Sequence, residues 1–176
     1  PRAASRRSRT RRPRRRPRAR SPPLAAEGPP VRVAAIVAAL VLAGYVLTLA
    51  PTVTLWDAGE LITAAHSLGI PHPPGTPLFV LVGHVWADVV AIGDYGWRLN
   101  FFSAVVSAAG AACLFLCAHR LLAGAPALER MGGAAAAALF AAFGLTSWQN
   151  ANESEVYGAA TAMIATFFPL RRASRW

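Results

Sequence analysis

The chain has 176 residues, of which 55% are hydrophobic and only 15% are charged, and its formal net charge is +10. Long uncharged apolar runs within such a composition favour a membrane protein over a soluble globule. Eleven of the 18 arginines fall between Arg2 and Arg20, so the excess positive charge belongs to one tail. Nucleic-acid binding would rest on that tail alone, and no aromatic residues are interleaved with its arginines, so no nucleic-acid partner is expected.

The first apolar run follows this tail. Residues 1–30 combine arginine, proline, serine and alanine with little to bury, which is typical of a disordered segment. Residues 33–50 contain no charge, and eighteen helical residues nearly cover a hydrocarbon core of about 30 Å. A signal peptide is the alternative, but its apolar part is usually about 7–15 residues long, and Pro51 stands where cleavage would occur. We therefore predict an uncleaved first span.

Three further runs are candidates for crossing the membrane, and a fourth is ambiguous. The three candidates are residues 99–122, 131–148 and 156–170. The ambiguous run, residues 78–92, is short and carries His84 and Asp88 on one helical face. An aspartate at the centre of a bilayer costs on the order of 3 kcal/mol, so this run is a doubtful span on its own.

The arginines decide between the two topologies, because arginine in short loops marks the cytoplasmic side. If residues 78–92 do not cross, every arginine except Arg98 is cytoplasmic; if they cross, Arg120 and Arg130 move outside. We therefore predict an all-α integral membrane protein with a cytoplasmic N-terminus. Its membrane domain, residues 31–176, would have about four spans and one long outer loop, residues 51–98, that carries interfacial or re-entrant helices.

This topology gathers six of the eight acids on the outer face. Two of them, in the stretch "DAGE", lie within one turn of a predicted helix whose apolar positions follow a helical period. Asp57 and Glu60 are typical of a capping box at the helix start, and the same carboxylates could also act as a general base toward a hydroxyl group. The six predicted outer acids are Asp57, Glu60, Asp88, Asp94, Glu153 and Glu155.

Other polar residues of the outer loops also have two interpretations. His72 lies in the proline-rich connector "GIPHPPGTP", where it could bind a metal, donate to a phosphate oxygen or be merely structural. Arg98 could bind a lipid phosphate or anchor the chain at the interface beside Trp97. Glu155 and Tyr157 follow in the second outer loop. No metal site is predicted, and the sequence does not decide whether a divalent cation or another cofactor takes part.

Three stretches together resemble a known membrane protein family. They are "TLWDAGELITAAHSLGIPHPPGTPLFVLVGHVWA", "GWRLNFFSAVVSA" and "ESEVYG". They are similar to membrane proteins related to the transmembrane O-mannosyltransferase of plexin-type receptors, a group that has a bacterial branch and resembles the C-type glycosyltransferases. The resemblance implies many membrane helices, an acid in the first outer loop, and a sugar donor linked to a polyprenyl phosphate.

Residue by residue, the resemblance implies that Asp57 is the catalytic acid of the first loop and that Glu60 is its companion. The implied contacts to the substrate or to the donor phosphate are made by His72, Arg98, Asn100, Glu155 and Tyr157. Relatives continue with further spans, so the chain is expected to be a fragment of a longer protein or a frameshifted product, and to be inactive alone.

The resulting expectation is a multi-pass protein of the inner (plasma) membrane that transfers a sugar from a lipid-linked donor to a protein or glycan hydroxyl. Asp57 would accept the proton and Arg98 would steady the phosphate. The alternative is a non-enzymatic membrane module, such as a transporter fragment or an assembly partner. Acids gathered at one interface favour the enzyme, because a transporter is expected to place polar groups near the midplane.

Overall fold

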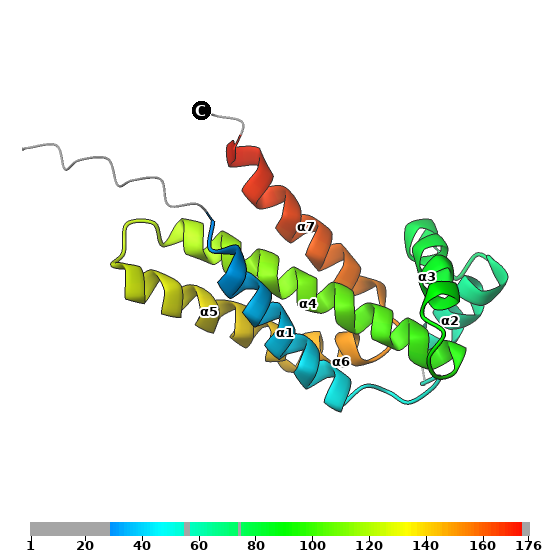
Figure 1. The fold of residues 1–176 in the computed structure, drawn as a ribbon. Helices are drawn as coiled ribbons and strands as arrows, with labels where there is room; N and C mark the ends of the chain where they lie inside the picture. Colours follow the sequence, from blue (N-terminus) through cyan, green and yellow to red (C-terminus); the bar gives the residue numbers. More distant parts are fainter. Residues whose placement is uncertain (1–28, 55–56, 74, 174–176) are drawn as a thin grey trace, which may run out of the picture.

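The structure is a computed structural model that describes residues 29–54, 57–73 and 75–173. These residues form seven helices and no strand, so the predicted all-α class is confirmed for the described part of the chain (Figure 1). The helices are α1 (Val31–Leu47), α2 (Asp57–Ser67), α3 (Pro77–Val89), α4 (Tyr95–Leu121), α5 (Ala127–Phe143), α6 (Leu145–Asn152) and α7 (Val156–Ala173).

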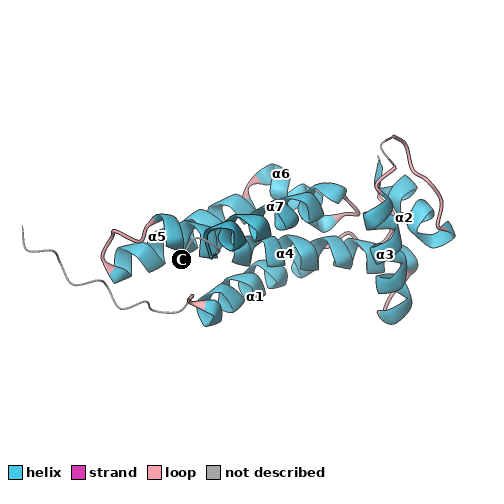
Figure 2. Cartoon of the chain, turned by 90° about the horizontal axis from the view of Figure 1, so that it is seen from above, coloured by secondary structure: helices cyan, strands magenta, loops and turns pink. Residues whose placement is uncertain are grey.

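The long helix α4 is the centre of the molecule, and α1, α5 and α7 run alongside it in alternating directions (Figures 1 and 2). Small buried residues allow these helices to approach closely, as is common in membrane helix bundles. Larger side chains fill the space between α1 and α4, and the buried hydroxyl of Tyr45 donates to the carbonyl of Ala142 at 2.8 Å. The buried core residues of this bundle include Val37, Val41, Tyr45, Ala104, Ala108, Ala111, Phe115, Ala134 and Ala138.

Among the described helices, α4 alone is long and apolar enough by itself to cross a membrane. Helices α5 and α6 would form a second span together, but the chain bends by 62° between them. The bend falls at Gly144, whose extended ψ of 141° interrupts the helix. Helix α1 and the apolar part of α7 are shorter than a usual span. Helix length and composition therefore do not confirm the prediction of four spans.

Helices α2 and α3 form a separate pair at one end of the bundle, and α3 lies across the direction of α4 rather than along it (Figures 1 and 2). Pro77 begins α3, and Asp94 caps α4 by accepting a hydrogen bond from the backbone of Trp97 at 2.7 Å. A second core joins this pair to the start of α4. Its buried residues are Leu61, Ile62, Ala65, Phe79, Ala87, Leu99 and Phe102.

Charge is unevenly distributed along the bundle, although Glu129 lies with the arginines and Arg98 lies with the acids. The start of α1, the connection between α4 and α5, and the end of α7 lie at one end, whereas α2, α3 and the connection between α6 and α7 lie at the other (Figure 1). Arg32, Arg120 and Arg130 belong to the first end. The acidic residues of α2 and of the connection before α7 belong to the second.

Candidate functional site

The connection between α1 and α4 is held together by a pair formed between Glu60 and His72. One oxygen of the Glu60 carboxylate accepts a hydrogen bond from the backbone N–H of His72 at 2.6 Å, and the other lies 2.8 Å from the ring Nδ1. Both hydrogen bonds therefore attach the proline-rich connector to the first turn of α2. Both oxygens of the Glu60 carboxylate therefore contact His72.

This pair changes the titration of both groups. The hydrogen bond from His72 holds the pKa of the Glu60 carboxyl below its ordinary value. The same bond, together with the negative charges of Glu60, Asp57 and Glu155, raises the pKa of His72. About half of each side chain is exposed, at 49% for His72 and 47% for Glu60, so the pair is screened by solvent. The raised pKa favours the imidazolium form of His72, whose side chain is half exposed to solvent.

Asp57, His72, Glu155 and Tyr157 line one small cavity of about 30 Å³. The carboxylate of Asp57 is exposed, whereas Glu155 is partly buried. Burial raises the pKa of Glu155, and the charges of Asp57 and Glu153 raise it further. The remaining lining residues are Leu61, Pro71, Thr76 and Val156. Two carboxyl groups in different surroundings are an arrangement suited to acid–base chemistry.

Asn100 brings together the two segments that carry these acids. Its side chain is fully buried and donates to the carbonyls of Ala50 and Thr52, at 3.0 and 2.9 Å. The same side chain accepts a hydrogen bond from the Ser154 hydroxyl at 2.8 Å. Asn100 therefore holds residues 50–52, which precede Asp57 in the chain, against the connection between α6 and α7, which contains Glu155.

Arg98 lies outside the small cavity. Its guanidinium group donates to the carbonyl of Ala87 at 3.0 Å and to that of Gly93 at 3.1 Å. These bonds tie the end of α3 to the start of α4. The structure thus brings Asp57, Glu60, His72, Glu155 and Tyr157 together, and it places Arg98 and Asn100 among backbone contacts around them.

Asp57, Glu60 and His72 could also hold a divalent cation, because one possible ligand atom from each lies within 4.8 Å of the others. All three residues are exposed. The sequence analysis did not predict such a site, because the path of the proline-rich connector back to α2 cannot be read from residue spacing. Binding a cation through Nδ1 of His72 would require the hydrogen bond to Glu60 to break.

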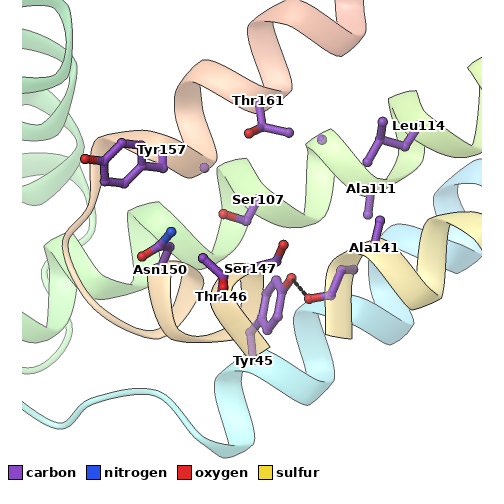
Figure 3. A pocket seen from close by; sticks show the side chains of 13 residues that line it. Tyr45, Ser107, Ala111, Leu114, Ala141, Thr146, Ser147, Asn150, Tyr157 and Thr161 are labelled. Carbon is purple, nitrogen blue, oxygen red and sulfur yellow. Dashed lines mark hydrogen bonds between the residues drawn. The ribbon is translucent and has the colours of Figure 1, made fainter. Parts of the chain in front are cut away.

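A larger cavity of about 560 Å³, which sequence reasoning missed, lies between α1, α4, α5, α6 and α7 (Figure 3). Its residues come from five helices, so no local motif announces it. The only local signal is the set of small and hydroxyl-bearing residues on α4 and α7. The lining residues are Tyr45, Ser107, Gly110, Ala111, Leu114, Ala141, Ala142, Thr146, Ser147, Asn150, Tyr157, Gly158 and Thr161.

Comparison with known proteins identifies the family. Residues 57–172 match the family described as the Protein O-mannosyl-transferase TMEM260 N-terminal domain. The chain is 35% identical over 152 residues to the mouse Protein O-mannosyl-transferase TMEM260, which covers 84% of the chain but only 21% of the mouse protein. The protein of the same name from Dictyostelium discoideum is 34% identical over 74 residues, which covers 41% of the chain and 9% of that protein.

No solved structure matches the chain. The chain spans about a fifth of the length of the mouse relative, and the matched region contains both acidic segments of the small cavity. The predicted relation to O-mannosyltransferases is therefore confirmed, and the chain belongs to the family of the protein O-mannosyl-transferase TMEM260 N-terminal domain.

Proposed function

We propose that this chain forms the acceptor-activating part of a membrane mannosyltransferase, which moves a sugar from a polyprenyl-phosphate donor to a hydroxyl group on the outer face. The observation that carries the proposal is the meeting of Asp57, His72 and Glu155 in one small cavity. These residues come from segments almost a hundred positions apart in the sequence. The names of the relatives support the sugar and the kind of reaction.

Asp57 is assigned the role of general base. Its carboxylate is exposed in the cavity, so an acceptor hydroxyl can reach it. In the transfer step, the acceptor oxygen forms a bond to the anomeric carbon of the sugar and gives its proton to Asp57. The bond between that carbon and the phosphate oxygen breaks, and its electron pair leaves with the lipid phosphate.

His72 is assigned the role of facing the departing phosphate. Its bond to Glu60 raises its pKa, which favours the imidazolium form, and an imidazolium stabilises the negative charge that develops on a leaving phosphate. The binding of the donor phosphate by Arg98 remains a prediction. Its guanidinium group already donates hydrogen bonds to the carbonyls of Ala87 and Gly93. Glu155 also lines the small cavity, and burial raises the pKa of its carboxyl.

The membrane placement is part of the proposal. Four helices, α1, α4, α5 with α6, and α7, run along the bundle, and their outward surfaces expose large apolar side chains such as Ile36, Leu40, Phe140 and Ile164. Arg32, Arg120 and Arg130 lie at one end of this bundle, whereas the candidate site and Arg98 lie at the other; apart from Arg98, this distribution is what the positive-inside rule expects for an outer-face site. Helices α2 and α3 would then lie at the outer interface of the inner (plasma) membrane.

The donor distinguishes this proposal from other forms of mannosyl transfer. The longest native form of the protein, reconstituted in vesicles, is given radiolabelled mannose either on a polyprenyl phosphate or on a nucleotide diphosphate, with a serine- and threonine-rich acceptor peptide. We expect label in the peptide only from the lipid-linked donor. Transfer from the nucleotide sugar alone would refute the donor, and no transfer from either would favour a non-enzymatic module.

A further inference from the structure

The large cavity has a polarity that changes along its length. Figure 3 shows Tyr157 and Asn150 toward one end and the side chains of Ala111, Leu114 and Ala141 toward the other. The hydroxyl groups of Ser107, Ser147 and Thr161 lie between them. The Ser107 hydroxyl is buried and has no hydrogen-bond partner within the described part of the chain. A cavity of this kind is suited to a molecule with one polar and one apolar end.

The cavity is also next to the candidate reaction site, because Tyr157 lines both. A ligand could therefore place its polar head against the exposed side chains of His72 and Tyr157, beside the small cavity, and extend its apolar part past Tyr157 into the large one. The volume of about 560 Å³ is within the range of about 300–1,000 Å³ that is usual for sites binding small molecules.

The walls of the large cavity favour a single chain. Gly110, Ala111, Ala142 and Gly158 contribute almost no side-chain volume, so the helix backbones themselves form much of the surface. The Cα of Gly158 lies so close to Ser107 that an added Cβ would collide with the Ser107 hydroxyl. A slot walled by backbone in this way fits one narrow chain better than the two chains of a glycerophospholipid.

We infer that the large cavity binds the apolar chain of a single-chain lipid phosphate whose head lies at the small cavity. The inference rests on the proposed function, because it locates the lipid part of the donor. The apolar outer surface of the bundle would let such a chain enter from the bilayer. Tyr157 stands at the junction and would separate the reacting head from the apolar chain.

Photocrosslinking tests the inference without requiring transfer. The protein in vesicles is exposed to geranylgeranyl phosphate that carries a diazirine at the far end of its chain, and the labelled residues are mapped by mass spectrometry. We expect label on the parts of α4 and α5 that line the large cavity. Label confined to the outer surface of the bundle would overturn the inference, as would equal cavity labelling by a phosphatidylglycerol probe with the same diazirine.

A matched pair of substitutions sharpens the test. Ala141→Phe places a ring in the apolar end of the cavity, whereas Ala136→Phe places the same ring at an exposed position of α5 outside the lining. Labelling of the cavity should fall roughly tenfold in the first variant, the effect of excluding about two methylene groups, and stay unchanged in the second. Equal labelling in both variants would overturn the inference.

Thr146→Phe, at another exposed lining position, replaces Ala141→Phe if that variant does not fold, which circular dichroism would reveal.

The two proposals, the proposed function and the binding of a lipid chain in the large cavity, can fail separately. Mannosyl transfer with no label in the cavity overturns the chain site and leaves the proposed function intact. Label in the cavity of a protein that transfers no sugar supports the chain site and refutes the proposed function.

Discussion

Removing the side chain of Asn100 tests whether one buried amide holds the two acidic segments together. Asn100→Ala removes two hydrogen bonds to the carbonyls of Ala50 and Thr52 and one from the Ser154 hydroxyl. At about 1 kcal/mol of net stabilisation each, the three bonds contribute about 3 kcal/mol to the free energy of unfolding. For a chain of this length, that loss corresponds to a Tm lower by about 6–12 °C.

The assay is thermal unfolding of the purified protein in detergent, followed by tryptophan fluorescence. Asn100→Asp separates hydrogen bonding from loss of volume, because aspartate keeps the shape and the acceptor for Ser154 but cannot donate to the two carbonyls when ionised. We expect it to be at least as destabilising as Asn100→Ala, and Gln149→Ala, at an exposed position of α6, to leave Tm unchanged. The reasoning would be refuted if both variants at position 100 unfolded within about 2 °C of the native protein.

Two other predictions concern the charged pair and the topology. Nuclear magnetic resonance should find the pKa of His72 above the usual imidazole value of about 6.5, and Glu60→Gln should return it toward that value. The pair stabilises the fold at pH values between the lowered pKa of Glu60 and the raised pKa of His72. This stabilisation is lost as pH falls through the pKa of Glu60 or rises through the pKa of His72. An unchanged pKa of His72 in Glu60→Gln would exclude the pair. Single cysteines at positions 72 and 153, in a background without the native cysteines, should react with an impermeant reagent from outside, and one at position 125 should not. Labelling at position 125 would contradict the four-span topology.

The helices were predictable because their apolar runs are long, although their ends were not. The predicted span at residues 131–148 crosses the break at Gly144, since a single glycine is tolerated in many helices and only the backbone shows that it ends one here. Most of the predicted run at residues 78–92 forms α3 (Pro77–Val89), which lies across the end of the bundle; that this run does not cross the membrane stays a prediction.

The candidate site was predictable in its residues but not in its contacts. Asp57 and Glu155 were singled out by residue type, yet their meeting depends on the buried hydrogen bonds of Asn100, which link positions about fifty residues apart. The bond between Glu60 and His72 depends on how a proline-rich connector folds back, and helical periodicity carries no information about that path. The large cavity depends on the packing of five helices and was missed for the same reason.

The central claim, that the carboxylate of Asp57 activates the acceptor, is tested most directly by Asp57→Asn in the longest native form of the protein. Asparagine keeps the size of the side chain and caps a helix about as well as aspartate, but it cannot serve as a base. With lipid-linked mannose as donor, the transfer rate should fall by roughly 10²-fold or more while membrane level and Tm are kept. Asp88→Asn, a matched change at an exposed position of α3, should leave the rate unchanged. Near-normal turnover in Asp57→Asn would contradict the account.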